Sequence, residues 1–108
     1  MAKKKPPFAL MYSDEVKEHL RAIETKYHSL IQSEIGGQLQ FQPEVETRNR
    51  KPLERPMLSG AEWEIRFGPD NRFRVFYEVD AEAREVRVLA IGVKEGNRLL
   101  IGGEEFQG

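Results

Sequence analysis

The chain has 108 residues, of which 17 are Lys or Arg and 18 are Asp or Glu, with a formal net charge of −1 and no cysteine. This length predicts a single domain over residues 1–108, and the absence of cysteine excludes disulfide frameworks, zinc–thiolate sites and cysteine nucleophiles. A non-specific nucleic-acid binder usually has a strong basic excess, so any contact with phosphates must come from local clustering of charge. No apolar stretch reaches the length of a membrane span or a signal-peptide core, which predicts a cytoplasmic protein with no membrane partner.

The N-terminal part of the chain predicts one strand followed by helices. The apolar run at residues 8–12 is expected to form the strand, and Ser13 is expected to cap the helix that follows. Apolar residues then recur at the spacing of an amphipathic helix, at Val16, Leu20, Ile23, Tyr27, Leu30, Ile31, Ile35 and Leu39. Ser29 and Gln32 match a capping box, so we favour two antiparallel helices over one long helix, with Pro43 ending the second.

The segment 43–60 is rich in proline and charge and has few apolar residues. We interpret it as a long loop with room for a short strand or turn. Loops of this length in a compact domain are usually functional or mobile. The segment carries the basic residues Arg48, Arg50 and Lys51, but acidic residues lie nearby, and this mixture also fits a solvated loop.

The C-terminal half predicts an antiparallel sheet. Alternating apolar residues and a β-branched run predict three strands, at residues 63–67, 73–79 and 85–91. The Gly-Pro-Asp-Asn sequence at residues 68–71 is typical of a tight turn between the first two strands. Gly92 is expected to end the third strand, and residues 99–101 are expected to pack back on the sheet as a short apolar segment.

Two arginines on adjacent strands are candidates for binding an anion. If the strands pair through the turn at residues 68–71, Arg66 and Arg74 share one face, and their charges repel unless an anion lies between them. Phosphate is such an anion, and the guanidinium group matches its geometry. Glu64 and Glu78 have the same parity in these strands, however, so cross-strand ion pairs on a solvated face would explain the pattern without any function. From the residues alone, we favour this second interpretation.

Other catalytic patterns do not occur in the sequence. It has no glycine-rich phosphate loop, no Gly-x-Ser-x-Gly turn and no metal-ligand spacing. His19 and His28 are the only histidines, and we expect both to lie on the surface of a helical region. The sequence therefore implies no metal and no cofactor.

The order of the expected elements is a strand, two helices, a basic loop and three antiparallel strands. Over residues 8–101 this order resembles the RelE/ParE toxins of bacterial type II toxin–antitoxin systems. The motifs that carry the resemblance are Leu58-x-Gly60, Trp63-x-Ile65-x-Phe67, Phe73-Arg74-Val75-Phe76-Tyr77, Val88-Leu89-Ala90-Ile91-Gly92 and Lys94-Glu95. The resemblance implies an α+β fold in which two N-terminal helices pack on a four-stranded, mostly antiparallel sheet.

Toxins of the RelE branch enter the ribosome and cut the bound mRNA without a metal, which inhibits translation. The ribose 2′-hydroxyl attacks the adjacent phosphate, so the reaction needs a base, cations for the developing charge and an acid for the leaving oxygen. By position, the resemblance implies that Arg74 holds the phosphate. Arg66 and Lys94 would add positive charge, and Glu64 is a candidate base. The residues expected to bind the rest of the substrate are Arg48, Arg50, Lys51 and Arg98.

Two departures from the family pattern keep other functions open. Glu64 stands where RelE has a lysine, and Leu100 aligns with a tyrosine of the family. The resemblance is therefore also compatible with the ParE branch, which inhibits DNA gyrase and is not a nuclease, or with a degenerate toxin that only binds its antitoxin. In each case the implied partner is a cognate antitoxin that covers a sheet edge or an apolar groove. A nuclease would also bind the ribosome and mRNA, and an inhibitor would bind gyrase.

Overall fold

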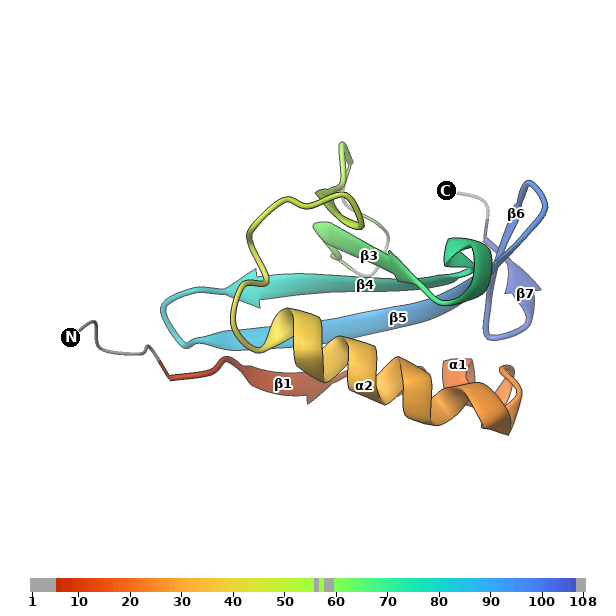
Figure 1. Cartoon of the computed structure of the whole chain (residues 1–108), viewed down its shortest axis with the longest axis horizontal. Coiled ribbons are helices and arrows are strands. Elements are labelled where there is room, and N and C mark those ends of the chain that lie inside the picture. The colour runs from red at the N-terminus through yellow and green to blue at the C-terminus, as the bar shows by residue number, and fades with distance from the viewer. Residues whose placement is uncertain (1–5, 56, 58–59, 107–108) are drawn as a thin grey trace.

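The computed structural model describes residues 6–55, 57 and 60–106, so Leu58 of the motif Leu58-x-Gly60 lies outside the described residues. The elements in chain order, with η for a 3-10 helix, are β1 (Ala9–Tyr12), α1 (Glu15–Arg21), η1 (Thr25–Tyr27), α2 (His28–Leu39), β2 (Arg50–Pro52), β3 (Trp63–Phe67), η2 (Pro69–Asn71), β4 (Phe73–Asp80), β5 (Glu85–Glu95), β6 (Arg98–Ile101) and β7 (Glu104–Glu105). Among the described residues, the strands form one seven-stranded sheet with two α-helices against it (Figure 1). No helix in this part of the chain is long and apolar enough to cross a membrane.

The strand β5 is the centre of the sheet. Neighbours along the path β2–β3–β4–β5–β6–β7 are antiparallel. On the edge of β5 opposite β4, the first half of the strand pairs in parallel with β1, and the second half pairs with β6. The α+β class and the mostly antiparallel sheet are therefore confirmed. The predicted number of four strands is wrong, because β2, β6 and β7 also join the described sheet.

Gly92 does not end β5, which continues to Glu95. Gly92 pairs with Ile101 of β6, and a Cβ atom on the glycine would lie 3.0 Å from both the Leu100 carbonyl oxygen and Leu99 Cδ1. Such contacts are tighter than a real side chain tolerates without movement of its neighbours. The missing side chain therefore lets β6 approach β5, and residues 99–101 form the end of that added strand.

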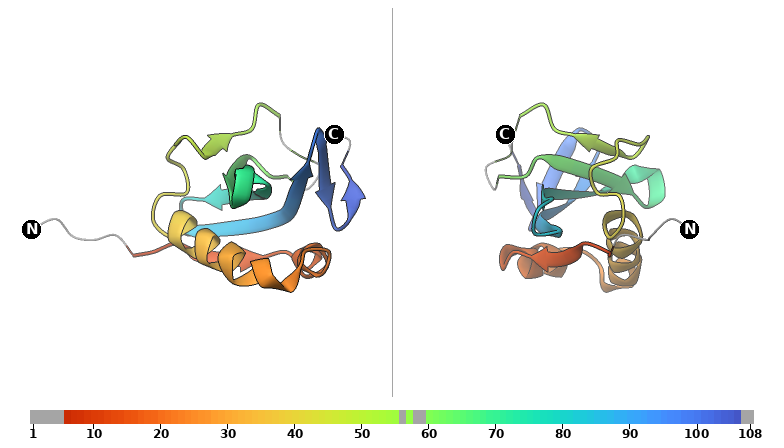
Figure 2. Two further views of the ribbon diagram at one scale, coloured as in Figure 1. Left: turned by 45° about the vertical axis from the view of Figure 1, so that its right-hand side comes forward. Right: turned by 90° about the vertical axis from the view of Figure 1, so that its left-hand side faces the viewer.

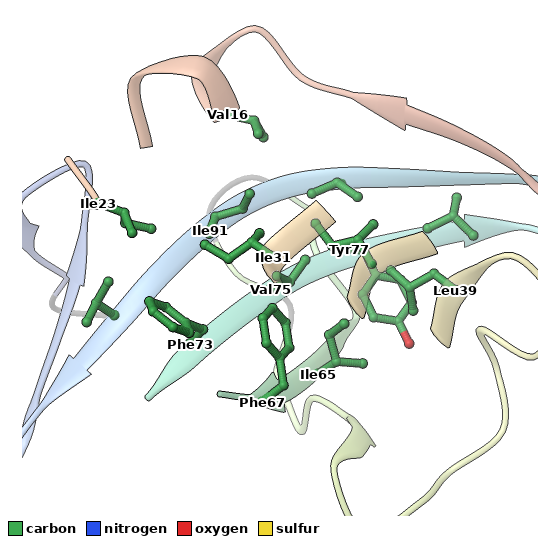
Figure 3. Packing of buried hydrophobic residues seen from close by; sticks show 14 of the residues in the cluster. Val16, Ile23, Ile31, Leu39, Ile65, Phe67, Phe73, Val75, Tyr77 and Ile91 are labelled. Carbon is green, nitrogen blue, oxygen red and sulfur yellow. The ribbon is translucent and has the colours of Figure 1, made fainter. Parts of the chain in front are cut away.

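One face of the sheet, the inner face, packs against the helices. Ile31, Ile35 and Leu39 of α2 are buried there, and α1 adds Val16. They belong to one apolar cluster with side chains of β3, β4 and β5, including Ile65, Phe73, Val75 and Tyr77 (Figure 3). Figure 2 shows both helices on the same side of the sheet. The two predicted helices therefore supply the cover for the main core.

The predicted cap of the first helix is wrong. The helix α1 begins at Glu15, and its N-cap is Asp14, which makes no side-chain cap hydrogen bond. Ser13 lies one residue earlier, and its hydroxyl donates instead to the backbone carbonyl of Leu89, at 3.2 Å. Ser13 therefore ties the start of α1 to the central strand.

The predicted capping box of the second helix is also wrong, although the helix begins within one residue of the expected place. The helix α2 begins at His28, and its N-cap, Tyr27, makes no side-chain cap hydrogen bond. His28 Nε2 lies 2.8 Å from the carbonyl oxygen of Leu20 and 2.9 Å from that of Ile23. This half-buried histidine therefore closes the connection between the helices and does not project into solvent as expected.

The opposite side of the sheet, the outer face, has a smaller apolar cluster. Phe76 lies opposite Ala90 and Tyr77 lies opposite Val88, so a β-bulge leaves Leu89 without a partner on β4. Phe76 and Ala90 are buried in this cluster, and Leu89 packs against them. The remainder of the outer face, along β3 and β4, carries charged residues.

Candidate functional site

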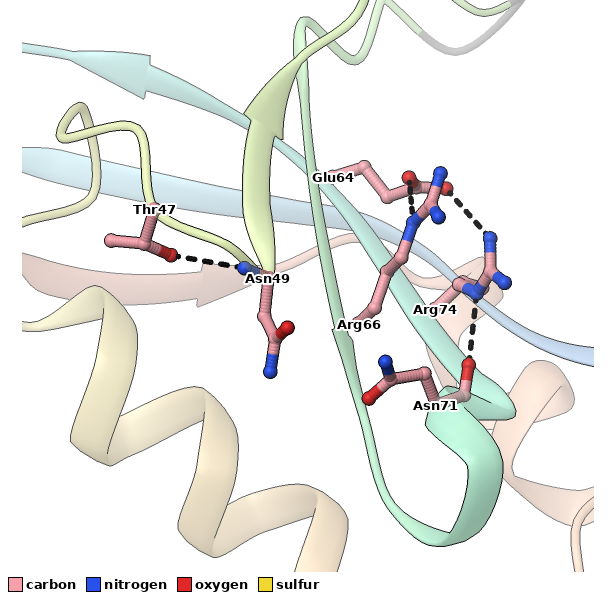
Figure 4. A network of polar contacts seen from close by, with 6 residues as sticks. All are labelled: Thr47, Asn49, Glu64, Arg66, Asn71 and Arg74. Atoms are coloured by element: carbon pink, nitrogen blue, oxygen red, sulfur yellow. Dashed lines mark hydrogen bonds and ion pairs between the residues drawn. The ribbon is translucent and has the colours of Figure 1, made fainter.

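Arg66 and Arg74 lie directly opposite each other on β3 and β4. Because side chains alternate along a strand, Glu64 shares the outer face with Arg66, two residues away. Arg66 Nε donates a hydrogen bond to Glu64 Oε1 at 2.8 Å, and Arg74 Nη1 lies 3.6 Å from Glu64 Oε2 (Figure 4). The predicted pairing of the two arginines is present, and the carboxylate of Glu64 is the anion between them.

The turn between β3 and β4 sets this register. Gly68 has a φ of 82°, and a Cβ atom there would lie 2.5 Å from the Phe73 ring. Asp70 and Asn71 also adopt left-handed backbone angles, with φ of 54° and 52°. Glycine, aspartate and asparagine accept such angles more readily than other residues, so this sequence fixes a tight turn. The Asn71 carbonyl then accepts a hydrogen bond from Arg74 Nε at 3.0 Å, which orients the arginine.

The two arginines differ in burial. The side chain of Arg66 is 43% exposed, whereas that of Arg74 is 14% exposed and that of Glu64 is 10% exposed. The expectation that both arginines face solvent is therefore right for Arg66 and wrong for Arg74. Burial lowers the pKa of Arg74, the charge of Arg66 lowers that pKa further, and Glu64 opposes the shift. An arginine stays protonated in proteins, so the pair is a site where added negative charge is stabilising.

Two lysines flank this pair on the outer face. Gly92 lies opposite Arg74 on β5, and Lys94 follows two residues later on the same face, where it pairs with Leu99 of the outer cluster. Lys51 of β2 lies opposite Glu64. We call Lys51, Glu64, Arg66, Arg74 and Lys94 the basic site. Side chains of β6 fill the place of the missing Gly92 side chain next to Arg74, so an anion would reach the guanidinium from the side of Arg66.

Three other predicted residues lie outside the basic site. Arg50 pairs with Ile65, so its side chain lies on the inner face, and the residue is only 5% exposed. Its guanidinium donates to the carbonyls of Gln38, Val45 and Gln42, and this holds the loop to the end of α2. The guanidinium of Arg50 therefore stabilises the fold and does not contribute to the basic site. Arg48 is exposed in the loop, and Arg98 lies 3.9 Å from Glu105 at the far hairpin.

The tyrosine of the motif Phe73-Arg74-Val75-Phe76-Tyr77 has a structural role in the core. Tyr77 is fully buried on the inner face, and its hydroxyl donates to the Pro43 carbonyl at 2.6 Å. Burial raises the pKa of this hydroxyl. Leu100 pairs with Val93, also on the inner side of β5, so no acid–base group stands at that position of β6.

Sequence reasoning missed a group of residues beside the β-bulge. Between the residues of β5 that pair with β1 and those that pair with β6, two backbone groups of β5 form hydrogen bonds with side chains in or just before α1. Ser13 bonds to Leu89, as described above, and His19 Nδ1 accepts a hydrogen bond from the Ile91 amide at 3.2 Å. Burial lowers the pKa of His19, and the charge of Glu15 opposes the shift. The one available signal was the spacing of Glu15 and His19, which places both on one face of a helix.

The fold is similar to that of a chain in the crystal structure of the toxin–antitoxin complex RelBE2 from Mycobacterium tuberculosis. The TM-score is 0.67 at 20% sequence identity, and the likeness covers 86% of this chain and 98% of that chain. No protein-family model matches the sequence, and no curated protein matches it. This likeness confirms the fold that the sequence predicts, which is RelE-like.

Proposed function

We propose that this protein is the toxin of a type II toxin–antitoxin system and that it cleaves mRNA on the ribosome without a metal ion. The fold supports the first part of this proposal, because a solved chain with the same fold belongs to a toxin–antitoxin complex. The observation that carries the second part is the direct opposition of Arg66 and Arg74 beside Gly92. Two guanidiniums on directly opposed residues can hold one phosphate between them.

The basic site has hydrogen-bond donors to spare for a phosphate. Arg74 uses Nε for the Asn71 carbonyl and Nη1 for Glu64, and Arg66 uses Nε for Glu64. Within the described residues, both Nη groups of Arg66 and Nη2 of Arg74 have no hydrogen-bond partner. In the proposed reaction these groups stabilise the charge that gathers on the phosphorane when the 2′-hydroxyl attacks. The P–O5′ bond then breaks, and the leaving 5′-oxygen takes its proton from water. Lys94 adds positive charge from the neighbouring strand.

Glu64 is the proposed base that takes the proton of the 2′-hydroxyl. Its position between Arg66 and Arg74 places a carboxylate next to the phosphate that those arginines would hold. When a phosphate binds, it competes with the carboxylate for the two guanidiniums and leaves Glu64 freer to accept a proton. Glu64 therefore links phosphate binding to proton transfer in this proposal.

A second candidate function is inhibition of DNA gyrase by binding. The observation in its favour is that both oxygens of Glu64 already lie against arginines and that Leu100 offers no acid for the leaving oxygen. In that case the basic site would contact gyrase through charge alone. A degenerate toxin that only binds its antitoxin is the third candidate, and the antitoxin is the expected partner in all three.

A paired assay separates these candidates. Purified protein is added to translating ribosomes, and cleavage of the bound mRNA is mapped by primer extension; the same preparation is added to a gyrase supercoiling reaction. We expect mRNA cleavage and unaffected supercoiling. Glu64→Gln should reduce the cleavage rate about a hundredfold if Glu64 is the base, and should change it little if Glu64 is only an ion-pair partner. Uncut mRNA together with blocked supercoiling would replace the nuclease by the inhibitor.

A test in cells addresses the antitoxin. Expression of the chain alone should arrest growth, and co-expression of the small protein encoded in the adjacent reading frame should restore it. A chain that is harmless at high expression would favour the degenerate toxin over both active ones.

A further inference from the structure

A cavity of about 440 Å³ opens at the β-bulge of β5. Its apolar walls include Leu89, Ala90, Ile101 and the ring of Phe106, and its polar groups include Glu15 and His19. The volume falls within the range of about 300–1,000 Å³ that is typical of small-molecule sites. Nothing in the proposed phosphate chemistry uses this cavity.

One wall of the cavity lies two residues along β5 from the position opposite Arg74. Ala90 precedes Gly92 by two residues on β5, and Gly92 is the residue opposite Arg74. A strand rises about 3.3 Å per residue, so the wall formed by Ala90 lies about 7 Å along the sheet from the level of Arg74. A ribose separates a nucleobase from its phosphate by a comparable distance. Both positions belong to the outer face, so a nucleotide bound at both would stay on one side of the sheet.

The lining of the cavity suits a flat heterocycle with a polar edge. Nucleobases stack on aromatic rings such as that of Phe106, which the hydrogen bond from its amide to the Leu99 carbonyl holds against β6, at 2.8 Å. His19 Nδ1 accepts the Ile91 amide, so in the neutral ring the proton is on Nε2, which is a donor. Glu15 is an acceptor when ionised. The cavity therefore supplies a stacking ring, one donor and one carboxylate.

We propose that this cavity binds a nucleobase of the RNA whose phosphate is held by Arg66 and Arg74, and that Glu15 and His19 select guanine. The inference rests on the proposed nuclease function and adds a base preference to it. Guanine offers two neighbouring N–H donors, which one carboxylate accepts together, beside a carbonyl oxygen that accepts from an imidazole N–H. The other bases present no such pair of adjacent donors.

The first test is an NMR titration of the whole chain with guanosine 3′-monophosphate, adenosine 3′-monophosphate and inorganic phosphate. The guanidinium Nε–H signals of Arg66 and Arg74 report the phosphate site, and the backbone amides of Ala90 and Phe106 report the cavity. We expect guanosine monophosphate to shift both sets of signals, inorganic phosphate to shift only the arginines, and adenosine monophosphate to bind more weakly. Guanosine monophosphate that shifts only the arginines would overturn the inference.

Two variants with matched controls complete the test. Phe106→Ala should weaken guanosine monophosphate about 5- to 150-fold, the range that corresponds to loss of one base-stacking ring, and should leave inorganic phosphate unchanged. Phe41→Ala removes a ring that is 61% exposed and does not line the cavity, and it should have no effect. Glu15→Gln should abolish the preference for guanine over adenine, whereas Glu18→Gln, one turn later, should preserve it. Equal nucleotide binding by wild type and Phe106→Ala contradicts the proposal.

The outcomes also separate this inference from the nuclease proposal. If the protein cuts no RNA but binds guanosine monophosphate through Phe106, the nuclease proposal fails and the nucleotide site remains. If it cuts ribosome-bound mRNA without a guanine preference that Glu15→Gln removes, the cavity has no role in recognition and the inference fails alone.

Discussion

The two faces of the sheet place arginine in opposite settings. On the inner face, Arg50 is almost fully buried, and its guanidinium donates to backbone carbonyls of the loop and of α2. On the outer face, Arg66 and Arg74 lie opposite each other and have a single carboxylate between them. The inner arginine has its partners from within the fold, whereas the outer pair has excess positive charge. This difference teaches that the surroundings of an arginine, rather than its place in a basic sequence, decide whether it can bind a ligand.

The largest expected effect is on stability at the inner arginine. Arg50→Ala removes a buried guanidinium and its hydrogen bonds to three backbone carbonyls, so the free energy of unfolding should fall by about 3 kcal/mol. Urea denaturation followed by circular dichroism measures this fall. Lys51→Ala is the matched control, because the neighbouring side chain is exposed and its loss should change stability by less than about 0.5 kcal/mol. Equal midpoints for Arg50→Ala and wild type would show that the carbonyls need no donor.

The next largest effect is on activity at the outer pair. Arg74→Ala should slow mRNA cleavage about a hundredfold, since one preorganised charge contact at a transition state is worth about 3 kcal/mol. Because Arg74 is largely buried against Glu64, we also expect a loss of stability of about 1 kcal/mol, which the solvent-facing position predicted from sequence would not produce. Arg87→Ala removes another outer-face arginine, paired with Glu78, and should leave cleavage unchanged. A comparable loss in both variants would mean that general surface charge, and not the basic site, drives the reaction.

A smaller effect should follow from adding a side chain at Gly92, where β6 packs closely against β5. Gly92→Ala places a Cβ atom against β6, and the required shift should lower the free energy of unfolding by about 2 kcal/mol. Thermal melts measure the change. Gly37→Ala, in α2, meets no atom within 4 Å and should instead raise stability by about 0.5–1 kcal/mol through its helix propensity. If both substitutions change the free energy of unfolding in the same way, the close approach of β6 to Gly92 does not affect stability.

The smallest expected effect is at Tyr77. Tyr77→Phe leaves the buried Pro43 carbonyl without its donor and should cost about 1–2 kcal/mol at neutral pH, with no change in cleavage. Burial raises the pKa of Tyr77 above its ordinary value of 10.0, so the folded state holds this proton more tightly than the unfolded state does. The wild type should therefore lose stability as the pH rises above about 10, and Tyr77→Phe should lose less over the same range. Urea denaturation of both proteins at about pH 8 and about pH 10.5 measures how much stability each loses as the pH rises.

The parts of this structure that follow local patterns were predictable from sequence. Alternation in residues 63–67 and 73–79, together with the turn chemistry at 68–71, was enough to place Arg66 and Arg74 on one face. The number of strands was not predictable in the same way. From its neighbours in sequence alone, Gly92 indicates the end of a strand. Only the packing of β6 against β5 shows that this position must lack a side chain. The four-strand prediction failed for that reason and because the short strand β2 has no alternation of its own.

The roles of single side chains were predictable only where their partners are neighbours in sequence. Arg50 has the same local context as Arg48, and only the return of the loop to the end of α2 brings backbone carbonyls to it. Ser13 and His19 likewise find their partners on β5, at Leu89 and Ile91. No local pattern contains such partners, so the sequence interpretation assigned Ser13 to a helix cap and His19 to the surface.

The parallel pairing of β1 with β5 has a consequence for how the molecule is made. The hydrogen bond from Ser13 to Leu89 joins residues 76 positions apart, and every partner of β1 in the sheet lies in the first half of β5. During synthesis from the N-terminus, the first strand must therefore wait until most of the chain has left the ribosome before it can dock. Pairings over such long sequence separations form slowly, because a large loop must close first. We expect a nascent chain that ends before residue 85 to be degraded rapidly by protease, and a protein proposed to act on ribosomes would thus acquire its folded form only near the end of its own translation.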